Sequence, residues 1–466
     1  MVDLFRLNVH GLTPVPRKGM VMRTQTELDL AAKYPRGVEI VRGKTKAVIR
    51  ITSSVDLAAL VSADDITAGD GAKHDVMLGK GQLSNQTTCN VFRLLNACGI
   101  HTAFVEQDSP NSFVATLCKM LPYEVVVRRE AHGSYCKRNP HIPKGHVFPK
   151  LVVEFFLKTS GRKWKTHGLP CDDPLMLFDG DGATGVRLYN PAKPIHGQEP
   201  FLVLPSGKVF TANEEWRRFG EMARIAVQAF LVLEKAWQLL RGKLVDFKVE
   251  FGLDRKGKLL LADVVDNDSW RVLDDEGTHL DKQTYRDGDE LGSVFAKYRQ
   301  VAEVTNRFGL PRQRLLFWRG SGSDSMDPFI EALEGLGVLP SQRVDTITVT
   351  CSAHKEPMRA VTTLLASLQD VPDSVVVAYV GMSNAAGPIL SAVSTTPVIT
   401  VPANVGVFPD DVWASLRAPR DVPVMTVLSP ANAVLAALNI LAMRNPFLYM
   451  VLRQRLEERL ANTVPI

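Results

Sequence analysis

The sequence predicts a chain of two domains, a mixed α+β domain followed by an α/β domain with a parallel sheet. A length of 466 residues with 45% hydrophobic content is enough for two separate cores. Up to about residue 290, β-rich runs and helical stretches are mixed without a regular order. After about residue 313, apolar β-rich runs alternate with helical stretches, which is typical of a parallel sheet covered by helices.

Composition excludes several classes of protein. Lys and Arg total 55 against 50 for Asp and Glu, and no block of like charge resembles a nucleic-acid-binding tail, so we expect small anionic ligands. The six cysteines form no Cys-x-x-Cys pair, which argues against a zinc cluster or a disulfide framework and favours a reducing compartment. No signal-peptide pattern and no membrane-length apolar run occur. We therefore expect a cytoplasmic protein that binds neither nucleic acid nor membranes.

The first domain begins after an N-terminal stretch, residues 1–36, that contains Pro14, Pro16 and Pro35 and is predicted to be an irregular arm without chemistry. Its remaining segments are, in order, β-rich runs at 47–52 and 124–129 around a helix at 83–98, a long excursion at 159–213 rich in Gly, Pro and Asp, and an amphipathic helix at 214–240.

A carboxylate-bearing hairpin follows at residues 244–263. If its polar turn is centred between Lys256 and Gly257, Glu250 lies directly across from Asp263. Two facing carboxylates are unfavourable unless a cation lies between them, and Mg²⁺, which binds carboxylate and phosphate oxygens, is the usual one. The hairpin thus predicts a magnesium and nucleotide-phosphate site; the alternative is that each carboxylate is solvated and paired with a lysine.

Groups that could bind anions gather elsewhere in this domain. Gly43-Lys-Thr-Lys46 places two ammonium groups beside a flexible glycine, suited to nucleotide phosphates or else forming an exposed basic turn. Arg128, Arg129 and His132-Gly-Ser134 offer guanidinium groups and backbone amides for carboxylates. Further polar groups stand at 64–70 and at 281–286.

The second domain follows a helix expected at 290–308, which Gly309 ends. Its predicted strands are 315–318, 346–350, 375–380, 398–401 and 424–428, and its predicted helices are 328–336, 357–368 and 431–443. Three strands are followed by small, polar turns: Gly320-Ser-Gly-Ser-Asp324, Cys351-Ser-Ala-His-Lys355 and Gly381-Met-Ser-Asn-Ala-Ala-Gly-Pro388. Ligands of open α/β sheets bind at these strand ends, so a phosphorylated ligand is expected there. His354 at such an end is a candidate for proton transfer, or else a surface histidine.

These motifs, taken in order, resemble two families. The first half resembles the motif series of phosphoribosylaminoimidazole-succinocarboxamide (SAICAR) synthetase. The motifs are Gly43–Lys46, Asp65-Ile-Thr-Ala-Gly, Gly133-Ser134, Asp172-Asp-Pro, Asp246-Phe-Lys-Val-Glu-Phe-Gly, Asp263, Asp268-Ser-Trp-Arg and Asp281-Lys-Gln-Thr-Tyr-Arg. The second half is similar to animal-type, class II, phosphoribosylaminoimidazole (AIR) carboxylase through Gly320–Asp324, Ser352-Ala-His-Lys, Gly381-x-Ser-Asn, Asp411-Val-Trp-Ala-Ser-Leu-Arg and Val427-Leu-Ser-Pro. Fusion in this order is that of the bifunctional animal purine-biosynthesis enzyme.

The resemblance implies a fold, an activity and an assembly. It implies an arm at 1–37, a SAICAR-synthetase-like ATP-binding α+β domain at 38–290, a helical linker at 291–312 and a three-layer, flavodoxin-like AIR-carboxylase domain at 313–466. The second domain would add CO₂ to aminoimidazole ribonucleotide (AIR) without ATP or biotin. The first would then join the product (CAIR) to L-aspartate with ATP and Mg²⁺, giving SAICAR. A homo-octamer assembled through the second domain is also implied.

The same resemblance implies residue roles. Catalysis of carboxylation falls to His354 with Lys355, and AIR and CO₂ would be bound by Ser321, Ser323, Asp324, Ser352, Ser383, Asn384 and Gly387. ATP would be bound by Gly43, Lys44, Thr45, Lys46, Lys158 and Lys248, and the metal by Glu250 and Asp263. CAIR and aspartate would be held by Asp65, Thr67, Arg128, Gly133, Ser134, Asp268, Ser269, Arg271, Lys282 and Arg286.

The second domain departs from the family pattern. Ala385 and Ala386 stand in a loop that usually reads Ser-Asn-Gly-Leu-Gly-Pro, and Ala392-Val393 stands where Gly-Asn is usual. An alanine in place of glycine adds a methyl group and disfavours positive φ. Two alternatives to a bifunctional enzyme follow: a synthetase with a degenerate carboxylase domain that serves as an oligomerisation scaffold, and an ATP-binding regulatory protein without turnover.

Overall fold

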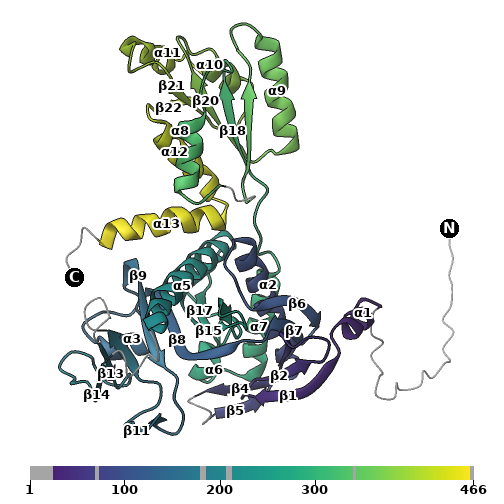
Figure 1. The fold of residues 1–466 in the computed structure, drawn as a ribbon, viewed down its shortest axis with the longest axis vertical. Coiled ribbons are helices and arrows are strands. Elements are labelled where there is room, and N and C mark those ends of the chain that lie inside the picture. The colour runs from purple at the N-terminus through teal and green to yellow at the C-terminus, as the bar shows by residue number, and fades with distance from the viewer. Residues whose placement is uncertain (1–24, 69–72, 179–184, 206–212, 340–342, 462–466) are drawn as a thin grey trace, which may run out of the picture.

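The computed structural model describes residues 25–68, 73–178, 185–205, 213–339 and 343–461 (Figure 1). A larger N-terminal body carries two antiparallel sheets, and a smaller C-terminal body carries a parallel sheet. The last helix, α13 (Pro446–Ala461), returns to the N-terminal body and lies beside α5 (Asn213–Leu239).

The first sheet has five strands in the order β1-β2-β3-β7-β6. Its strands are β1 (Arg36–Arg42), β2 (Lys46–Ile51), β3 (Leu57–Ser62), β7 (Ser112–Thr116) and β6 (Phe104–Ser109). The helix α2 (Lys80–Ala97) covers it, with Phe92 packed edge-on against Phe113 at 6.1 Å. The predicted helix at 83–98 is thus confirmed, with an earlier start. A helix α1 (Gln25–Lys33) lies in the arm that the sequence indicated to be irregular; residues 1–24 lie outside the described residues.

The second sheet has eight strands in the order β14-β13-β12-β9-β8-β15-β16, with β17 also paired to β15. Its strands are β14 (Leu202–Pro205), β13 (Gly185–Tyr189), β12 (Leu175–Phe178), β9 (Val147–Leu157), β8 (Lys119–Glu130), β15 (Lys243–Leu253), β16 (Leu259–Ala262) and β17 (Trp270–Leu273). The apolar face of α5 covers it, and Phe230 meets Phe247 of β15 edge-on at 5.4 Å. Residues 159–213, which were expected to form a long excursion, contribute the strands β12, β13 and β14 to this sheet.

Smaller elements complete the N-terminal body. They are the hairpin of β4 (Asp65–Ala68) and β5 (Lys73–Val76), the hairpin of β10 (Lys163–Trp164) and β11 (His167–Gly168), and the helices α3 (Ser134–Arg138), α6 (Gln283–Asp287) and α7 (Leu291–Thr305). The helix α7 packs on α2, burying Val294, Tyr298 and Val301.

The third sheet is parallel, in the order β19-β18-β20-β21-β22. Its strands are β18 (Arg314–Arg319), β19 (Asp345–Thr350), β20 (Ser374–Val380), β21 (Val398–Pro402) and β22 (Val424–Thr426). The helices are α8 (Asp327–Gly335), α9 (Pro357–Asp370), α10 (Ala386–Ala392), α11 (Val412–Leu416) after the short 3₁₀ turn η2 (Pro409–Asp411), and α12 (Pro430–Ala442).

Alternate residues of the central strand β18 belong to two different cores. Leu315 and Phe317 join the buried cluster that includes α8 and α12, whereas Leu316 and Trp318 join the cluster that includes α9 and α10. This is the pattern of a strand covered on both faces. The α/β three-layer architecture predicted from the sequence is therefore confirmed, as is the α+β class of the first domain.

We predict that Leu233→Ala lowers the free energy of unfolding by about 2–5 kcal/mol, because Leu233 of α5 is fully buried and truncation leaves a cavity. Leu239→Ala on the same helix, where the side chain is 40% exposed, is the matched control and should cost less than about 1 kcal/mol. Urea unfolding followed by tryptophan fluorescence measures both. Equal losses would contradict the placement of α5 in the core.

Candidate active sites

A cavity of about 980 Å³ lies at the sheet face formed by β8 and β15. Eight of the residues predicted for the synthetase site line it: Lys44, Arg128, Ser134, Lys248, Asp268, Ser269, Arg271 and Arg286. Asp172 and Asp173 of the Asp172-Asp-Pro motif, which had been given no role, also line it, as do Glu124, Arg138 and Asn190, which the sequence had not indicated. The structure thus brings together groups that are far apart in the sequence.

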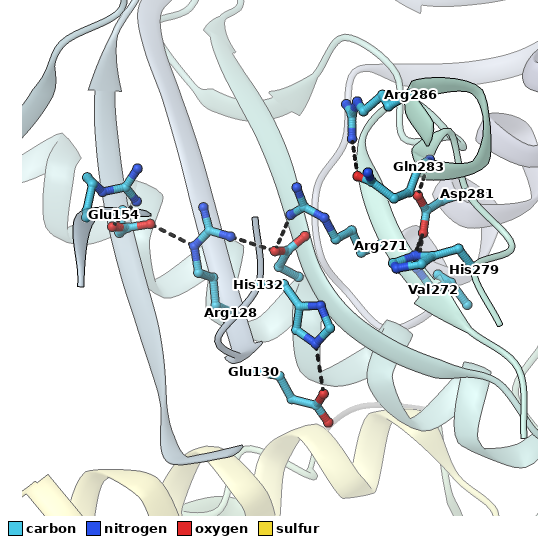
Figure 2. Close-up of polar contacts among 12 residues, drawn as sticks. Arg128, Glu130, His132, Glu154, Arg271, Val272, His279, Asp281, Gln283 and Arg286 are labelled. Atoms are coloured by element: carbon cyan, nitrogen blue, oxygen red, sulfur yellow. Dashed lines mark hydrogen bonds and ion pairs between the residues drawn. The ribbon is translucent and has the colours of Figure 1, made fainter. Parts of the chain in front are cut away.

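Asp246 of β15 holds two of the predicted arginines. Arg128 of β8 stands opposite Asp246 in the strand register, and the Nη1 atoms of Arg128 and Arg271 each donate to Asp246 Oδ2 at 2.6 Å (Figure 2). Arg128 Nε also donates to Glu154 Oε2 at 2.7 Å, and Arg138 Nη2 donates to Glu154 Oε1 at 2.6 Å. Burial opposes the charge of Arg128, but Asp246 and Glu154 raise its pKa. The result is a rigid set of guanidinium groups at the cavity wall.

The backbone conformation at position 133 and the nearby Arg271 side chain require a glycine there. The φ of Gly133, +58°, is in the range that favours glycine, and a Cβ there would overlap the Arg271 guanidinium. The turn at Gly133 also places Ser134, the first residue of α3, at the cavity.

A buried charge cluster surrounds Asp268. Its carboxylate accepts hydrogen bonds from Lys282 Nζ at 3.1 Å and from the Tyr298 hydroxyl, and it lies 3.5 Å from Lys80 Nζ. Burial opposes the ionisation of Asp268, but Lys80 and Lys282 lower its pKa to about 2. Sequence reasoning missed Lys80, which is 1% exposed; the signal was its position between Gly79 and Gly81 at the start of α2.

The predicted register of the carboxylate hairpin is wrong by one residue. Glu250 pairs with Ala262, not Asp263, because the turn is a five-residue loop centred on Lys256 and closed by Asp254 N to Lys258 O at 3.0 Å. Asp263 comes just after β16 with φ of +64°, a conformation that aspartate tolerates.

The two carboxylates are nevertheless close enough to interact. Burial and the charge of Asp263 both raise the pKa of Glu250. Each carboxylate also has a lysine partner, as the alternative interpretation expected: Lys46 pairs with Asp263, and Lys158 Nζ is 2.6 Å from Glu250 Oε2. Glu250 is buried, however, and not solvated as that interpretation expected. These two lysines are ones predicted to bind ATP, so the same place holds two carboxylates and two ammonium groups.

Mg²⁺ fits this donor set chemically, since it prefers carboxylate oxygens and completes its shell with phosphates and water. Within the described residues, no cluster of three or more His, Cys, Asp or Glu side chains could hold a metal by itself. Ion binding by Glu250 and Asp263 would therefore depend on a phosphate-bearing ligand.

The other residues predicted for the synthetase site lie at different distances from the cavity, some beside it and some away from it. The turn at Gly43 is closed by Gly43 N to Lys46 O at 2.8 Å and includes Thr45, and Lys248 Nζ contacts Glu124 Oε1 at 2.8 Å. Asp65 and Thr67 lie in β4, where Asp65 contacts His74 at 2.7 Å, and neither lines the cavity.

A second site lies at the carboxyl ends of β18, β19 and β20. His354 Nε2 and Ser383 Oγ are 2.8 Å apart, which joins the loops after β19 and β20. After β18, the Ser321 amide donates to Asp324 Oδ2 at 2.8 Å, and the Ser321 and Ser323 hydroxyls are 2.9 Å apart. Lys355 N donates to Ser352 O at 3.2 Å.

Gly387 and the two alanines define the third loop. The Gly387 amide donates to Asn384 Oδ1 at 2.8 Å, and a Cβ at Gly387 would overlap Asn384 and Thr400. Ala385 has φ of −87°, and Ala386 begins α10, so neither alanine occupies a conformation that requires glycine. The backbone argument against an active second domain therefore does not hold in this structure.

Two separate sites on two different folds define a fused protein with one candidate active site in each part. The SAICAR synthetase family model matches residues 39–163 and 207–305, and the AIR carboxylase model matches residues 318–462. The probable multifunctional protein ADE2 of Caenorhabditis elegans is 33% identical, over 93% of this chain and 96% of the relative. The human bifunctional phosphoribosylaminoimidazole carboxylase/phosphoribosylaminoimidazole succinocarboxamide synthetase is also 33% identical, over 90% and 93%.

The chain belongs to this family of fused SAICAR synthetase and AIR carboxylase proteins. A solved SAICAR synthetase in complex with ADP is 29% identical and covers 57% of this chain and 96% of that chain, with a TM-score of 0.45.

The described helices include none with the length and apolarity needed to cross a membrane. All six cysteines are free thiols.

We predict that Asp268→Asn makes the free energy of unfolding less dependent on pH in the acid range. A carboxyl whose pKa is lowered on folding stabilises the fold above its unfolded pKa, and this contribution is lost as pH falls from about 4 toward about 2. The difference in unfolding free energy between wild type and variant should therefore shrink over this range. Asp275→Asn, at a side chain 61% exposed, is the control and should leave the curve unchanged. A constant difference at all pH values would contradict the lowered pKa.

Proposed function

We propose that this chain is a bifunctional enzyme of purine biosynthesis that carboxylates AIR with CO₂ and then ligates CAIR to L-aspartate with ATP and Mg²⁺ to give SAICAR. The observation that carries the proposal is a cavity lined by lysines and by carboxylate-held arginines. Burial opposes the charge of one of these lysines, Lys248, but the carboxylates of Glu124, Glu250 and Asp263 raise its pKa. A second, separate site contains His354. Family membership supports both activities.

In the synthetase site, charge neutralisation and positioning are the main tasks. The ATP phosphates are bound by four lysines, Lys44, Lys46, Lys158 and Lys248. Gly43 and Thr45 form the turn that carries Lys44 and Lys46. When bound by Glu250 and Asp263, Mg²⁺ would neutralise phosphate charge. ATP activates the CAIR carboxylate as an acyl phosphate, and the amine of aspartate displaces phosphate from it.

The nucleotide and aspartate are bound by the cationic wall. Arg128 and Arg271 are already fixed by Asp246, so little side-chain entropy is lost when they bind an anion. Their partners in this role are Gly133, Ser134, Asp268, Ser269, Lys282 and Arg286. Asp65 and Thr67, which lie in β4 and do not line the cavity, are not assigned to the wall. Because its low pKa keeps Asp268 ionised, we assign this carboxylate to holding cationic or hydroxyl groups rather than to proton transfer.

In the carboxylase site, the reaction replaces the proton on the imidazole ring carbon of AIR with CO₂, and neither ATP nor biotin is needed. His354 moves that proton, with its ring oriented by Ser383, and Lys355 assists by holding carboxylate charge. Ser321, Ser323, Asp324, Ser352, Asn384 and Gly387 bind AIR and CO₂. The ordinary backbone of Ala385 favours this activity over the degenerate scaffold.

We also propose a homo-octamer assembled through the second domain, in the cytoplasm, with domain limits at 38–290, 291–312 and 313–466. The support for assembly is a set of exposed apolar side chains around β21, α11 and β22, namely Val407, Phe408, Trp413, Leu416 and Leu428, each more than half exposed.

The decisive experiment is an ATP-free carboxylation assay with AIR and bicarbonate, run beside a synthetase assay with CAIR, ATP and aspartate. Conversion in both supports the bifunctional enzyme. Synthetase activity alone would favour the scaffold alternative, and ATP binding without either conversion would favour the regulatory protein.

We predict that Glu250→Gln or Asp263→Asn lowers synthetase turnover about a hundredfold or more, because charge at the phosphates is no longer neutralised. Carboxylation should not change, since it takes place in the other domain. Glu303→Gln, on the exposed face of α7, is the control. An equal loss of both activities in a folded variant would refute the assignment.

We predict that His354→Asn lowers carboxylation by about 10²–10⁴-fold, because the proton shuttle is removed. The synthetase assay on the same preparation is the internal control and should be unaffected. Retained carboxylation would show that another residue moves the proton.

A further inference from the structure

The C-terminal helix α13 contacts α5 and β9, on the face of the eight-stranded sheet away from the cavity. In the β8–β9 pairing, Arg128 stands opposite Val152 but Glu130 stands opposite Val147, so four residues of β9, 148–151, lie opposite the single residue Arg129. Such a bulge leaves backbone groups without strand partners. Buried backbone groups of this kind must be satisfied elsewhere.

Side chains of α13 supply those partners. The Leu151 amide donates to Glu457 Oε2 at 2.9 Å in a buried contact, and Arg453 Nη2 donates to Pro149 O at 2.9 Å. Glu457 is 4% exposed and also accepts from Arg129 Nη2 at 2.7 Å. The helix therefore closes the bulge from outside the sheet.

Arg129 links this contact to α5 and to the bulge itself. Its Nε donates to Glu234 Oε1 at 2.6 Å, and its Nη1 donates to Phe148 O at 3.1 Å. Tyr449 of α13 donates to Glu234 Oε2 at 2.9 Å. Arg129 is thereby fixed from three elements.

Two connections along the chain join this cluster to residues at the cavity. Arg129 directly follows Arg128, whose side chain lines the cavity on the other face of β8. Glu154, which holds Arg128 and Arg138, lies three residues after Leu151 on the same strand. A shift of the bulge would move both Arg128 and its carboxylate partner.

We propose that Glu457 is a positioning residue for the synthetase site, so that the last helix of the chain completes the nucleotide-binding wall of the first domain. This inference rests on the proposed role of Arg128 in binding CAIR. It assigns to the C-terminal segment a function in the reaction of the other domain.

The test compares Glu457→Gln with Glu458→Gln in the full-length chain. Glu458 is exposed on the same turn of α13 and is the matched control. We expect Glu457→Gln to raise KM for CAIR about tenfold, because a small misplacement of a binding group is costly, with KM for ATP and carboxylase turnover within about twofold of wild type. Equal behaviour of the two variants, or a parallel loss of both activities, would overturn the proposal.

Hydrogen exchange provides a readout that does not depend on activity. The Leu151 amide should exchange faster in Glu457→Ala than in wild type or Glu458→Gln, because its buried acceptor is gone. Unchanged protection would show that α13 does not hold the bulge. Wild-type protein without synthetase activity would instead refute the proposed function, leaving the exchange result to decide the role of the helix.

Discussion

The structure of the candidate synthetase cavity depends on the ion pairs that Asp246 forms with Arg128 and Arg271. Asp246 stands on β15 opposite Arg128 of β8 and accepts from both Arg128 and Arg271, so three strands are tied together at the cavity wall. Removing one partner of a buried ion pair leaves an uncompensated charge, which makes such a pair costly to break. The wall is therefore rigid before any ligand arrives.

The parallel sheet could be predicted from the sequence because its strands are apolar on both faces. Leu315 and Leu316 serve opposite cores, and short apolar runs bounded by turn residues are typical of buried strands. The candidate site residues at the strand ends were proposed on the same grounds, since parallel strands present their carboxyl ends at one edge.

Other features depended on geometry that the sequence does not contain. The predicted hairpin register was wrong by one residue because the five-residue loop is centred on Lys256 rather than between Lys256 and Gly257. Asp263 adopts a positive φ just after the paired residues. Lys80 was missed because a buried lysine is rare. The helix α13 was missed because it buries Glu457, a charged residue that breaks the apolar stripe by which amphipathic helices are recognised.

The contact between Arg129 and Glu457 spans 328 positions of the chain. During synthesis, the first domain leaves the ribosome long before α13 exists, so the Leu151 amide and the Pro149 carbonyl of the strand bulge lack their α13 partners until that helix emerges. Local elements can form early, whereas this closure is among the last events of folding. A nascent or prematurely terminated chain would thus carry an unfinished ligase half, even though every residue of that half had already been translated.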